Sequence, residues 1–245
     1  MLIFYNLLSI CWNLIISKYI IEQMKNCVKT NGKNCILIFD DGTYFLGIGA
    51  GNHGDVHGEI CFNTSITGYQ EILTDPSYYN QIINFTFPHI GIVGTNFKDY
   101  ESDKIYASGC IINNPLTKPS NYRSELSFDS WLKKNNKVCI TGIDTRILTK
   151  KIRDSGVCQA LIHFPKTGKF DKLTSLQHKL RGFPKMNNLD LASEVSTKKI
   201  YKWMNGKKET HNIENTKNKF IGVVDFGIKK NILNLLSTFG YELII

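Results

Sequence analysis

Residues 62–96 read FNTSITGYQEILTDPSYYNQIINFTFPHIGIVGTN, and this stretch decides the fold of the 245-residue chain. It carries little charge and is rich in side chains that form hydrogen bonds without being ionised. An exposed loop would contain more Lys and Glu, and a core strand would contain more aliphatic residues. The stretch therefore indicates a backbone held in a defined path, with hydroxyl and amide groups turned toward a ligand or a second domain.

A strand, a tight turn and a short helix are predicted at the start of this stretch. Gly58–Phe62 has the composition of a strand, and Gly68 can adopt a positive φ that lets the chain reverse direction. Tyr69–Leu73 suits a short helix that ends before Pro76. Gln81–Phe87 follows, with the β-branched and aromatic residues of a second strand.

The rest of residues 35–165 also alternates short apolar runs with turn residues. Further strands are predicted at Cys35–Phe39, Tyr44–Leu46, Ile105–Ile112 and Val138–Ile143, and helices at Ser127–Lys134 and Arg146–Asp154. Asp144 or Thr145 can cap the second helix, and Gly156 can end it. Residues 35–165 are therefore predicted to form one strand-rich α+β domain.

The segment 166–219 is polar and rich in Lys, and it contains most of the chain's formal net charge of +9. One short helix is predicted in it, at Leu189–Val195. We interpret the segment as a solvated connection between domains. The sequence has no recognition-helix, zinc-finger or RNP pattern, so no nucleic-acid partner is predicted. A basic module that binds phosphates is the less favoured interpretation.

Residues 220–245 change in character. Phe220–Asp225 is predicted to be a buried strand, Gly227 turns the chain, and Tyr241–Ile245 begins a second strand. The helix between them has apolar residues at the spacing of one face, namely Ile228, Ile232, Leu235, Leu236 and Phe239. Strand, helix and strand in this order open a doubly wound parallel sheet. One such unit cannot bury both faces of a sheet, so we expect the chain to be shorter than the folding unit that it begins.

Residues 1–34 form an N-terminal extension of uncertain status. No charged residue occurs from Leu2 to Ser17, yet this run is shorter than the roughly 20 residues that a membrane-spanning helix needs. No basic residue precedes the run and no small-residue cleavage site follows it, so it fits a secretory signal poorly. Three alternatives stay open: an upstream extension with Met24 as the true start, an accessory helix, and a membrane anchor, which is the least expected.

Seven cysteines are scattered along the chain without a C-x-x-C pair. An odd number without a small secreted scaffold indicates reduced thiols in a reducing compartment. We expect a cytoplasmic protein, with an organelle stroma as the alternative. His53 and His57 have no acidic or thiol partner at metal-ligand spacing, so they are predicted to be ordinary loop histidines, and no metal site is predicted.

The stretch FNTSITGYQEILTDPSYYNQ closely resembles the signature of the small, glutamine-hydrolysing subunit of carbamoyl phosphate synthetase, with Ile66 where Met is usual. The resemblance continues in order through FPHIGIVGTN, ESDKI, PSNYRS, GIDTRILTKKIR and VVDFGIKKNIL. It covers about residues 36–245. It implies an amino-terminal domain of the swivelling β/β/α type at 35–165, followed at 220–245 by the start of a flavodoxin-like class I glutamine amidotransferase domain.

The resemblance also implies a role for Ser65. The serine at this place in the family helps to hold glutamine at the boundary between the two domains, whereas the residues alone also allow Ser65 to cap the following turn. The Cys, His and Glu of the family's catalytic triad have no counterpart here and are expected beyond residue 245. We therefore predict no catalytic residue in this chain and no glutaminase activity for it alone.

The partners that the resemblance implies are glutamine and the large subunit. The small subunit hydrolyses glutamine and passes ammonia to the large subunit. The large subunit uses bicarbonate and two ATP with a divalent metal to make carbamoyl phosphate for pyrimidine and arginine synthesis. No cofactor is expected in this chain itself, and a membrane partner is not favoured. The alternative function is a non-catalytic interaction domain that docks on the large subunit.

Overall fold

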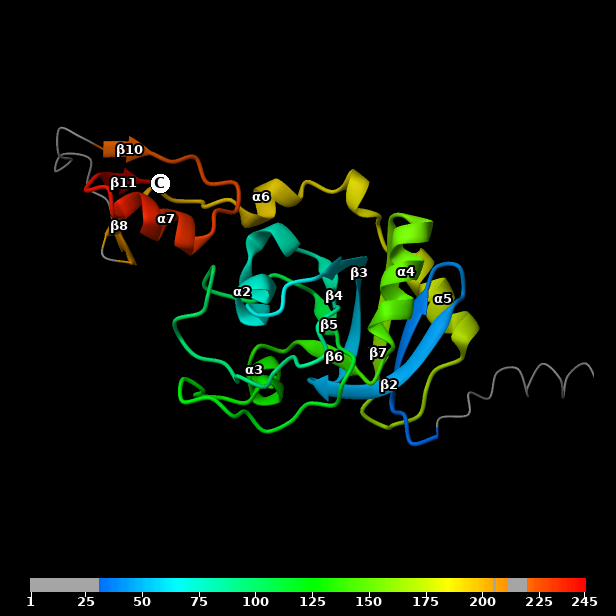
Figure 1. Cartoon of the computed structure of the whole chain (residues 1–245). Coiled ribbons are helices and arrows are strands. Elements are labelled where there is room, and N and C mark those ends of the chain that lie inside the picture. The colour runs from blue at the N-terminus through cyan, green and yellow to red at the C-terminus, as the bar shows by residue number, and fades with distance from the viewer. Residues whose placement is uncertain (1–30, 205, 211–219) are drawn as a thin grey trace, which may run out of the picture.

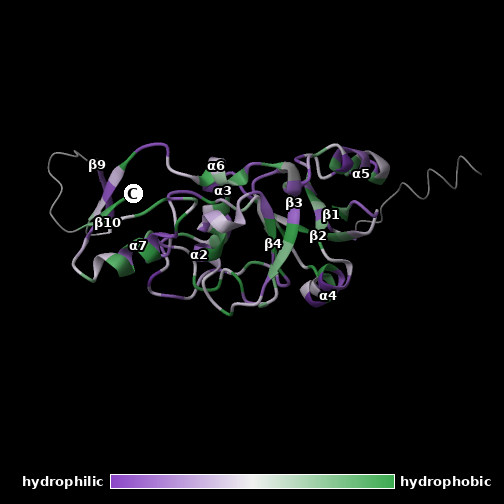
Figure 2. Ribbon diagram, turned by 90° about the horizontal axis from the view of Figure 1, so that it is seen from above, coloured by the Kyte–Doolittle hydropathy of each residue, from purple (hydrophilic) through white to green (hydrophobic). Residues whose placement is uncertain are grey.

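The computed structural model describes residues 31–204, 206–210 and 220–245 (Figure 1). Most of the predicted extension 1–34, and part of the predicted connection 166–219, lie outside these residues. A closed β-barrel and a small C-terminal sheet occupy opposite ends of the described chain. Seen from above, helices α2, α3 and α6 lie between these two ends (Figure 2).

The barrel has seven strands in the order β1-β2-β6-β5-β4-β3-β7, and β7 pairs with β1 to close it. The strands are β1 (Cys35–Phe39), β2 (Tyr44–Gly51), β3 (Gly54–Asn63), β4 (Gln81–Phe85), β5 (Gly109–Ile111), β6 (Val138–Thr141) and β7 (Cys158–Phe164). Strands β3, β4, β5 and β6 run parallel to their neighbours in this series, and the other pairings are antiparallel. Closure leaves this sheet without an edge strand.

Strand β1 shows how a short apolar run becomes a fully buried strand. Cys35, Leu37 and Phe39 belong to the core cluster that the barrel strands share. Ile36 and Ile38 point to the other face and join a cluster under helix α5. Because side chains alternate between the faces of a strand, both faces of β1 are buried, which explains why the run contains no polar residue.

Six helices accompany the sheets in the described residues. They are α2 (Tyr69–Thr74), α3 (Phe128–Lys134), α4 (Thr145–Ser155), α5 (Leu173–Arg181), α6 (Leu191–Val195) and α7 (Lys230–Ser237), with 3₁₀ turns at Pro76–Tyr78 and Met186–Asn188. None of them is both long and apolar enough to cross a membrane. The predicted helices are confirmed to within a few residues. So are the predicted strands of the barrel, although β2 and β3 are longer and β5 is shorter than predicted, and β7 was not predicted.

Side-chain caps fix the start of three of these helices, α3, α4 and α6, the last through Asp190. The hydroxyl of Ser127 accepts a hydrogen bond from the backbone amide of Ser130 at the start of α3. Asp144 accepts from the amides of Arg146 and Ile147 at the start of α4, which decides between the two predicted caps. Gly156 ends α4 with a φ of 74°, as predicted.

Helices α2 and α3 pack together on the outer face of the barrel. Their buried side chains include Leu73 from α2 and Phe128 and Trp131 from α3. These contact outward-facing residues of the parallel strands, such as Ile83 and Cys110. The parallel part of the sheet is therefore covered on both faces, as parallel strands normally are.

The described part of 166–219 holds more regular structure than the sequence predicts. Helix α5 packs against β1 and β7 through Leu176 and Leu180, an i, i+4 pair whose signal is masked by the surrounding lysines. Strands β8 (Tyr201–Met204) and β9 (Lys207–Thr210) pair antiparallel, and Tyr201 and Trp203 are buried in β8. These parts of the segment therefore belong to the two folded units, and the boundaries of the predicted connection stay a prediction.

The C-terminal sheet has the order β10-β11-β8-β9. Strands β10 (Phe220–Gly222) and β11 (Glu242–Ile244) are parallel and are joined through α7, which confirms the predicted strand–helix–strand unit. Strand β8 pairs antiparallel with β11, so the described sheet is mixed rather than wholly parallel.

Two burial predictions for this unit are wrong. Strand β10 is not buried, since Phe220 is 53% exposed. Helix α7 buries Leu233 and partly buries Leu236 against the sheet, while the predicted core residues Leu235 and Phe239 are 57% and 73% exposed. Apolar residues occur around much of α7, and only the side that faces β8 and β11 has a sheet to pack against.

Candidate functional site

The candidate site is the loop between β3 and α2, residues 63–68, which we call the Ser65 loop. Strand β3 ends at Asn63, which lies opposite Phe85 of the parallel strand β4. The helix begins after Gly68, whose φ of 84° lies in the left-handed region that glycine adopts without strain. Ser65 is exposed at the middle of this loop.

Asn63 holds the backbone of the Ser65 loop. Its side-chain oxygen accepts from the amide of Ser65 at 2.9 Å, and its side-chain nitrogen donates to the hydroxyl of Tyr78 at 3.1 Å. Its carbonyl oxygen accepts from the amide of Thr86 at 3.0 Å. Asn63 is thus anchored to Tyr78 and Thr86, and it holds the backbone of Ser65 through one hydrogen bond. Helix α2 has Gly68 at its N-cap and no side-chain cap, so Ser65 does not cap it.

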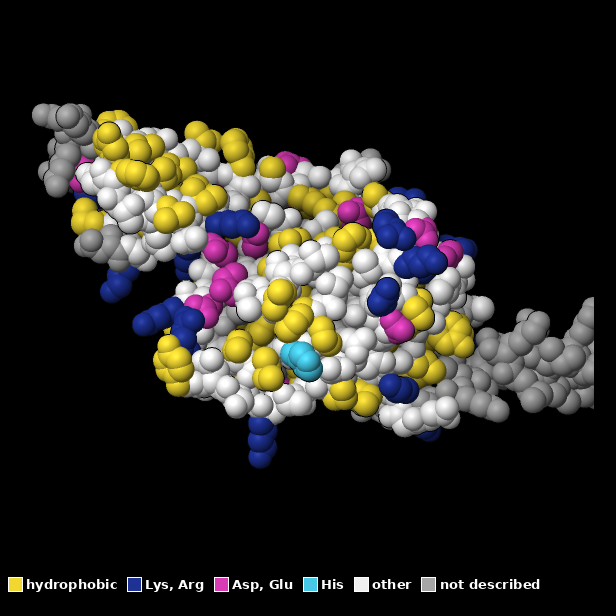
Figure 3. All heavy atoms as spheres, in the orientation of Figure 1, with side chains coloured by type: hydrophobic (Ala, Val, Ile, Leu, Met, Phe, Trp, Pro, Cys, Tyr) yellow, Lys and Arg dark blue, Asp and Glu magenta, His cyan; other side chains and the backbone are white. Residues whose placement is uncertain are grey.

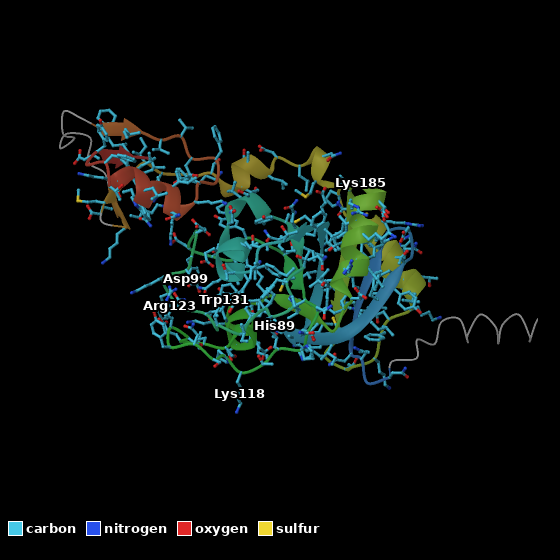
Figure 4. The ribbon with its side chains drawn as sticks, in the orientation of Figure 1. His89, Asp99, Lys118, Arg123, Trp131 and Lys185 are labelled. Atoms are coloured by element: carbon cyan, nitrogen blue, oxygen red, sulfur yellow. The ribbon has the colours of Figure 1, made fainter. Side chains whose placement is uncertain are left out.

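A polar hollow of about 250 Å³ begins where the Ser65 loop enters α2. It is lined by residues from three separate segments, namely Thr67, Gly68, Tyr69, Gln70, Glu71, Val93, Gly94, Asn96, Asp99, Asn121 and Arg123. Arg123 and Asp99 form an ion pair of 2.5 Å at its edge, and Figure 4 shows the two side chains together. Three of the motifs singled out in the sequence, GYQE, TN and PSNYRS, therefore meet here.

The first residues of α2 fasten this hollow to the neighbouring loop. The hydroxyl of Tyr69 donates to the carbonyl of Gly94, and burial raises the pKa of Tyr69. The amide side chain of Gln70 donates to the carbonyl of Asn96 at 2.6 Å and accepts from its backbone amide at 3.0 Å. Both Tyr69 and Gln70 are buried, and their polar groups form the hydrogen bonds that fix the loop.

Glu71 gives the hollow its electrostatic character. Burial raises the pKa of its carboxyl, and the nearby carboxylates of Asp99 and Glu101 raise it further. Arg123 opposes this effect by favouring the ionised form. A carboxyl group, an ion pair and amide groups around one hollow can bind a zwitterionic or amide-bearing ligand, because both charges and both hydrogen-bonding types are present.

The other end of α2 contacts the C-terminal unit. Asp75 accepts from the amide of Ser77 at 2.9 Å and forms a 2.7 Å ion pair with Lys229, just before α7. The Asp75 side chain is only 4% exposed. Helix α2 therefore carries the Ser65 loop at its start and an ion pair to the C-terminal unit at its end.

A second and larger hollow lies between the barrel and the C-terminal sheet. Its volume is about 840 Å³, and it is lined by the loop 101–106, the end of α6, the β8–β9 hairpin and the turn before α7. Figure 3 shows acidic and basic side chains next to one another where the C-terminal unit meets the barrel. The opposing charges make this junction a polar one rather than a continuation of either core.

The described cysteines do not supply a nucleophile to either hollow. Cys35, Cys110, Cys139 and Cys158 are buried, and burial raises the pKa of the half-buried Cys61 to about 12. A thiol with such a pKa is protonated at neutral pH and reacts poorly. Cys11 and Cys27 lie outside the described residues.

The histidines named in the sequence analysis also lie away from the Ser65 loop. His53 packs against Phe164, with 4.0 Å between ring centroids, and His57 stacks on Phe183 at 3.4 Å. His57 is in strand β3 rather than in a loop, which corrects the prediction. No three His, Cys, Asp or Glu residues gather as a metal-binding group within the described ranges.

Sequence reasoning placed Ser65 on an exposed loop, and the structure agrees on this position. Its role in binding glutamine stays a prediction. The sequence did not predict the Gln70–Asn96 pair that fixes the loop. It also did not predict the ion pair of Asp99 and Arg123 beside this loop. All of them fall within or next to the quoted motifs, but no local pattern signals a contact between segments so far apart.

Comparison with known proteins places the chain in a family. Residues 37–162 match the family model described as carbamoyl-phosphate synthase small chain, CPSase domain. The carbamoyl phosphate synthase small chain of Zymomonas mobilis is 42% identical over 208 residues, which cover 83% of this chain and 55% of that protein.

Two proteins of the same name from Buchnera aphidicola are similarly close. The one from subsp. Acyrthosiphon pisum is 46% identical and covers 82% of this chain and 53% of that protein. The one from subsp. Schizaphis graminum is 47% identical, with coverage of 84% and 54%. The chain thus spans about half the length of these relatives. The family model covers the barrel that carries the Ser65 loop, and the chain belongs to the carbamoyl-phosphate synthase small chain family.

Proposed function

We propose that this chain acts as a small subunit of glutamine-dependent carbamoyl phosphate synthetase, in which glutamine supplies the ammonia that a large subunit consumes. The large subunit would combine this ammonia with bicarbonate, using two ATP and a divalent metal, to give carbamoyl phosphate for pyrimidine and arginine synthesis. We place the protein in the cytoplasm, with an organelle stroma as the alternative. Membership of the family supports this proposal.

One observation carries the proposal for this chain: Ser65 is exposed on an anchored loop at the start of a helix whose far end contacts the C-terminal unit. In the proposal Ser65 donates a hydrogen bond to glutamine from the barrel side. The C-terminal unit is the start of a flavodoxin-like amidotransferase domain that faces it. The described cysteines are unsuited to attack, so the nucleophile is assigned to other residues.

Catalysis then requires that glutamine be held between two folded units. A pocket at such a junction can exclude water and fix the carboxamide carbon close to an attacking thiolate. A single neutral hydrogen bond from Ser65 contributes about 0.5–1.5 kcal/mol, so its loss should weaken binding several-fold without abolishing the chemistry.

The test uses the assembled enzyme, with the small chain carrying its amidotransferase part beside the large subunit. Ser65→Ala should raise the KM for glutamine about three- to ten-fold. Carbamoyl phosphate formation from added ammonia bypasses the glutamine site, so its rate should not change. Ser155→Ala, on the exposed surface of α4, is the matched control. An unchanged KM for glutamine in Ser65→Ala would exclude the proposed contact.

A separate measurement tests the prediction about the 245-residue chain alone. Purified without any further segment, it should release no glutamate from glutamine. Release of glutamate at a rate that is abolished by changing one of the seven cysteines would show that the assignment of the nucleophile is wrong.

A second candidate function is a non-catalytic interaction domain that docks on the large subunit. Exposed apolar side chains favour it: Ile66, Val93, Phe97 and Tyr122 are 67%, 45%, 73% and 95% exposed and lie in or next to the segments that line the smaller hollow. Retention of the large subunit by this chain, together with unaltered glutamine kinetics in Ser65→Ala, would favour this function over the first.

A further inference from the structure

Helix α7 is capped by a residue from the other folded unit. Its N-cap residue, Lys229, provides no side-chain cap. The carbonyl of Glu101 accepts from the amide of Lys230 at 2.8 Å, and the carboxylate of Glu101 accepts from the amide of Asn231 at 3.0 Å. The first amides of a helix have no hydrogen-bond partner within the helix. A carboxylate at this end also interacts favourably with the positive end of the helix dipole. Glu101 thus caps α7, a role that a residue adjacent to the helix in the sequence normally has.

Glu101 is itself fastened to α2. Its backbone amide donates to the hydroxyl of Thr74 at 3.0 Å, and that hydroxyl donates to the carbonyl of Gln70 at 2.9 Å. The hydroxyl of Ser102 donates to the carbonyl of Thr74. Thr74 is fully buried. A continuous series of hydrogen bonds therefore runs from α2, which follows the Ser65 loop, through Glu101 to the first turn of α7.

Close packing supports the same junction independently. Gly227, in the turn before α7, has a φ of 97°, and a Cβ built on it would lie 3.0 Å from the Cβ of Pro76 and 2.8 Å from a methyl group of Val195. Asp225 accepts from the amides of Gly227 and Ile228, both at 2.8 Å, which shapes this turn. The turn is thus shaped to lie directly against the end of α2.

Two ion pairs flank the cap and differ in burial. Asp75 is 4% exposed where it meets Lys229, and its carboxylate raises the pKa of that lysine. Asp103 is 77% exposed where it meets Lys230. Exposed ion pairs contribute little to stability, so the buried carboxylate of Asp75 and the two hydrogen bonds that Glu101 accepts from the first turn of α7 define the geometry. Asp103 provides a neighbouring acid of equal charge whose removal leaves the cap in place.

The position of α7 matters because it follows the carboxyl end of β10. In open α/β sheets, ligands bind in the crevice at the carboxyl ends of the strands, beside the first turns of the helices. We infer that Glu101 is a positioning residue, which sets the first turn of α7, and with it this edge of the C-terminal unit, at a fixed distance from the Ser65 loop. The inference rests on the proposed function, in that glutamine is to be held between these two places.

The first test measures hydrogen exchange on the full chain and needs no activity. Glu101→Ala should speed the exchange of the amides at the start of α7 about ten-fold or more, whereas Asp103→Ala should leave it within about two-fold. Glu101→Gln keeps an acceptor oxygen and should restore most of the protection. It also keeps the test decisive if Glu101→Ala fails to fold. Equal exchange in the wild type and all three variants overturns the inference.

The second test measures kinetics on the enzyme assembled with its large subunit. Glu101→Ala should raise the KM for glutamine at least five-fold and leave synthesis from ammonia unchanged, and Glu101→Gln should recover most of the loss. Faster exchange without a change in the KM for glutamine overturns the positioning role while the proposed function stands. Faster exchange in Glu101→Ala, together with a wild-type assembled enzyme that cannot use glutamine at all, overturns the proposed function instead.

Discussion

The side-chain amide of Gln70 pairs with the backbone of Asn96 through both of its ends, at 2.6 and 3.0 Å, and thereby ties the helix after the Ser65 loop to a loop 26 residues further along the chain. A carboxamide offers a donor and an acceptor on one side chain, whereas an ionised carboxylate offers acceptors only. Because Gln70 is 3% exposed, water cannot replace either hydrogen bond if the side chain is changed.

Gln70→Glu should therefore destabilise the protein by about 1–3 kcal/mol at neutral pH, because the carboxylate faces the carbonyl of Asn96 with no hydrogen to donate. Urea unfolding followed by circular dichroism measures the change. Asn187→Asp, at an exposed position of the 3₁₀ turn Met186–Asn188, is the matched amide-to-acid control and should change stability far less. Equal losses in both variants would contradict the importance of the Gln70–Asn96 pair.

Gly58→Ala should destabilise the barrel by about 1–3 kcal/mol, since overpacking forces the backbone to shift. A Cβ at Gly58 would lie 2.3 Å from the carbonyl oxygen of Asn80, which belongs to the turn before β4 and cannot rotate away. Thermal unfolding provides the measurement. Gly222→Ala in β10 serves for comparison, because nothing lies within 4 Å of the added carbon and no stability should be lost.

Glu71→Gln should stabilise the protein at neutral pH. Burial raises the pKa of the Glu71 carboxyl, so the ionised group costs the folded state free energy at any pH where it is charged. The advantage of Gln should be largest near pH 7 and should shrink as the pH falls and Glu71 takes up a proton in the wild type.

Melting temperatures measured from pH 7.5 to 4 would show this convergence. Glu125→Gln removes an exposed carboxylate from the neighbouring loop and controls for the change in net charge. A Glu71→Gln protein that melts below the wild type at pH 7 would contradict the argument. Because Glu71 lines the hollow beside Ser65, the gain in stability should come with weaker glutamine use if the hollow binds substrate.

Acid should weaken the contact between β3 and the segment after α5. Burial lowers the pKa of His57, and the charge of Lys179 lowers it further. The unfolded chain then takes up a proton near its usual pKa of about 6.5 that the folded chain resists, so stability falls as the pH decreases through this value. His57→Gln should reduce the slope of stability against pH between 7.5 and 5.5.

His178→Gln, on the exposed side of α5, tests whether any histidine would have the same effect. It should leave the slope unchanged. Identical slopes in the wild type and His57→Gln would show that stacking on Phe183 does not hold His57 in its neutral form.

Much of the barrel could be predicted from local patterns. The strand at Cys35–Phe39 and the helix after Ser127 are specified by residues within a few positions of each other, through a continuous apolar run in one case and apolar residues at helical spacing in the other. Closure of the sheet could not be predicted in this way. It depends on pairing β1 with β7, and no residue in either strand marks the other as its partner.

In the candidate site, too, local features could be predicted from the sequence and contacts between distant segments could not. Gly68 was found because a turn between a strand and a helix has a recognisable composition, whereas Ser65 was singled out by the resemblance to the family signature. The Gln70–Asn96 pair and the Glu101 cap were not found, because each joins segments whose contact exists only in the folded chain. The buried face of α7 was predicted wrongly, since apolar residues around most of a helix do not indicate which side meets a sheet.

The pairing of β1 with β7 has a consequence for the way this barrel can be joined to other sequences. Ile36 lies opposite His163 in antiparallel register, so the chain enters and leaves the barrel at adjacent positions. A short linker could connect these two places, and new ends could then be opened in the exposed segment around Tyr122. The barrel is thus suited to circular permutation, and equally to insertion as a whole into a surface loop of an unrelated host protein.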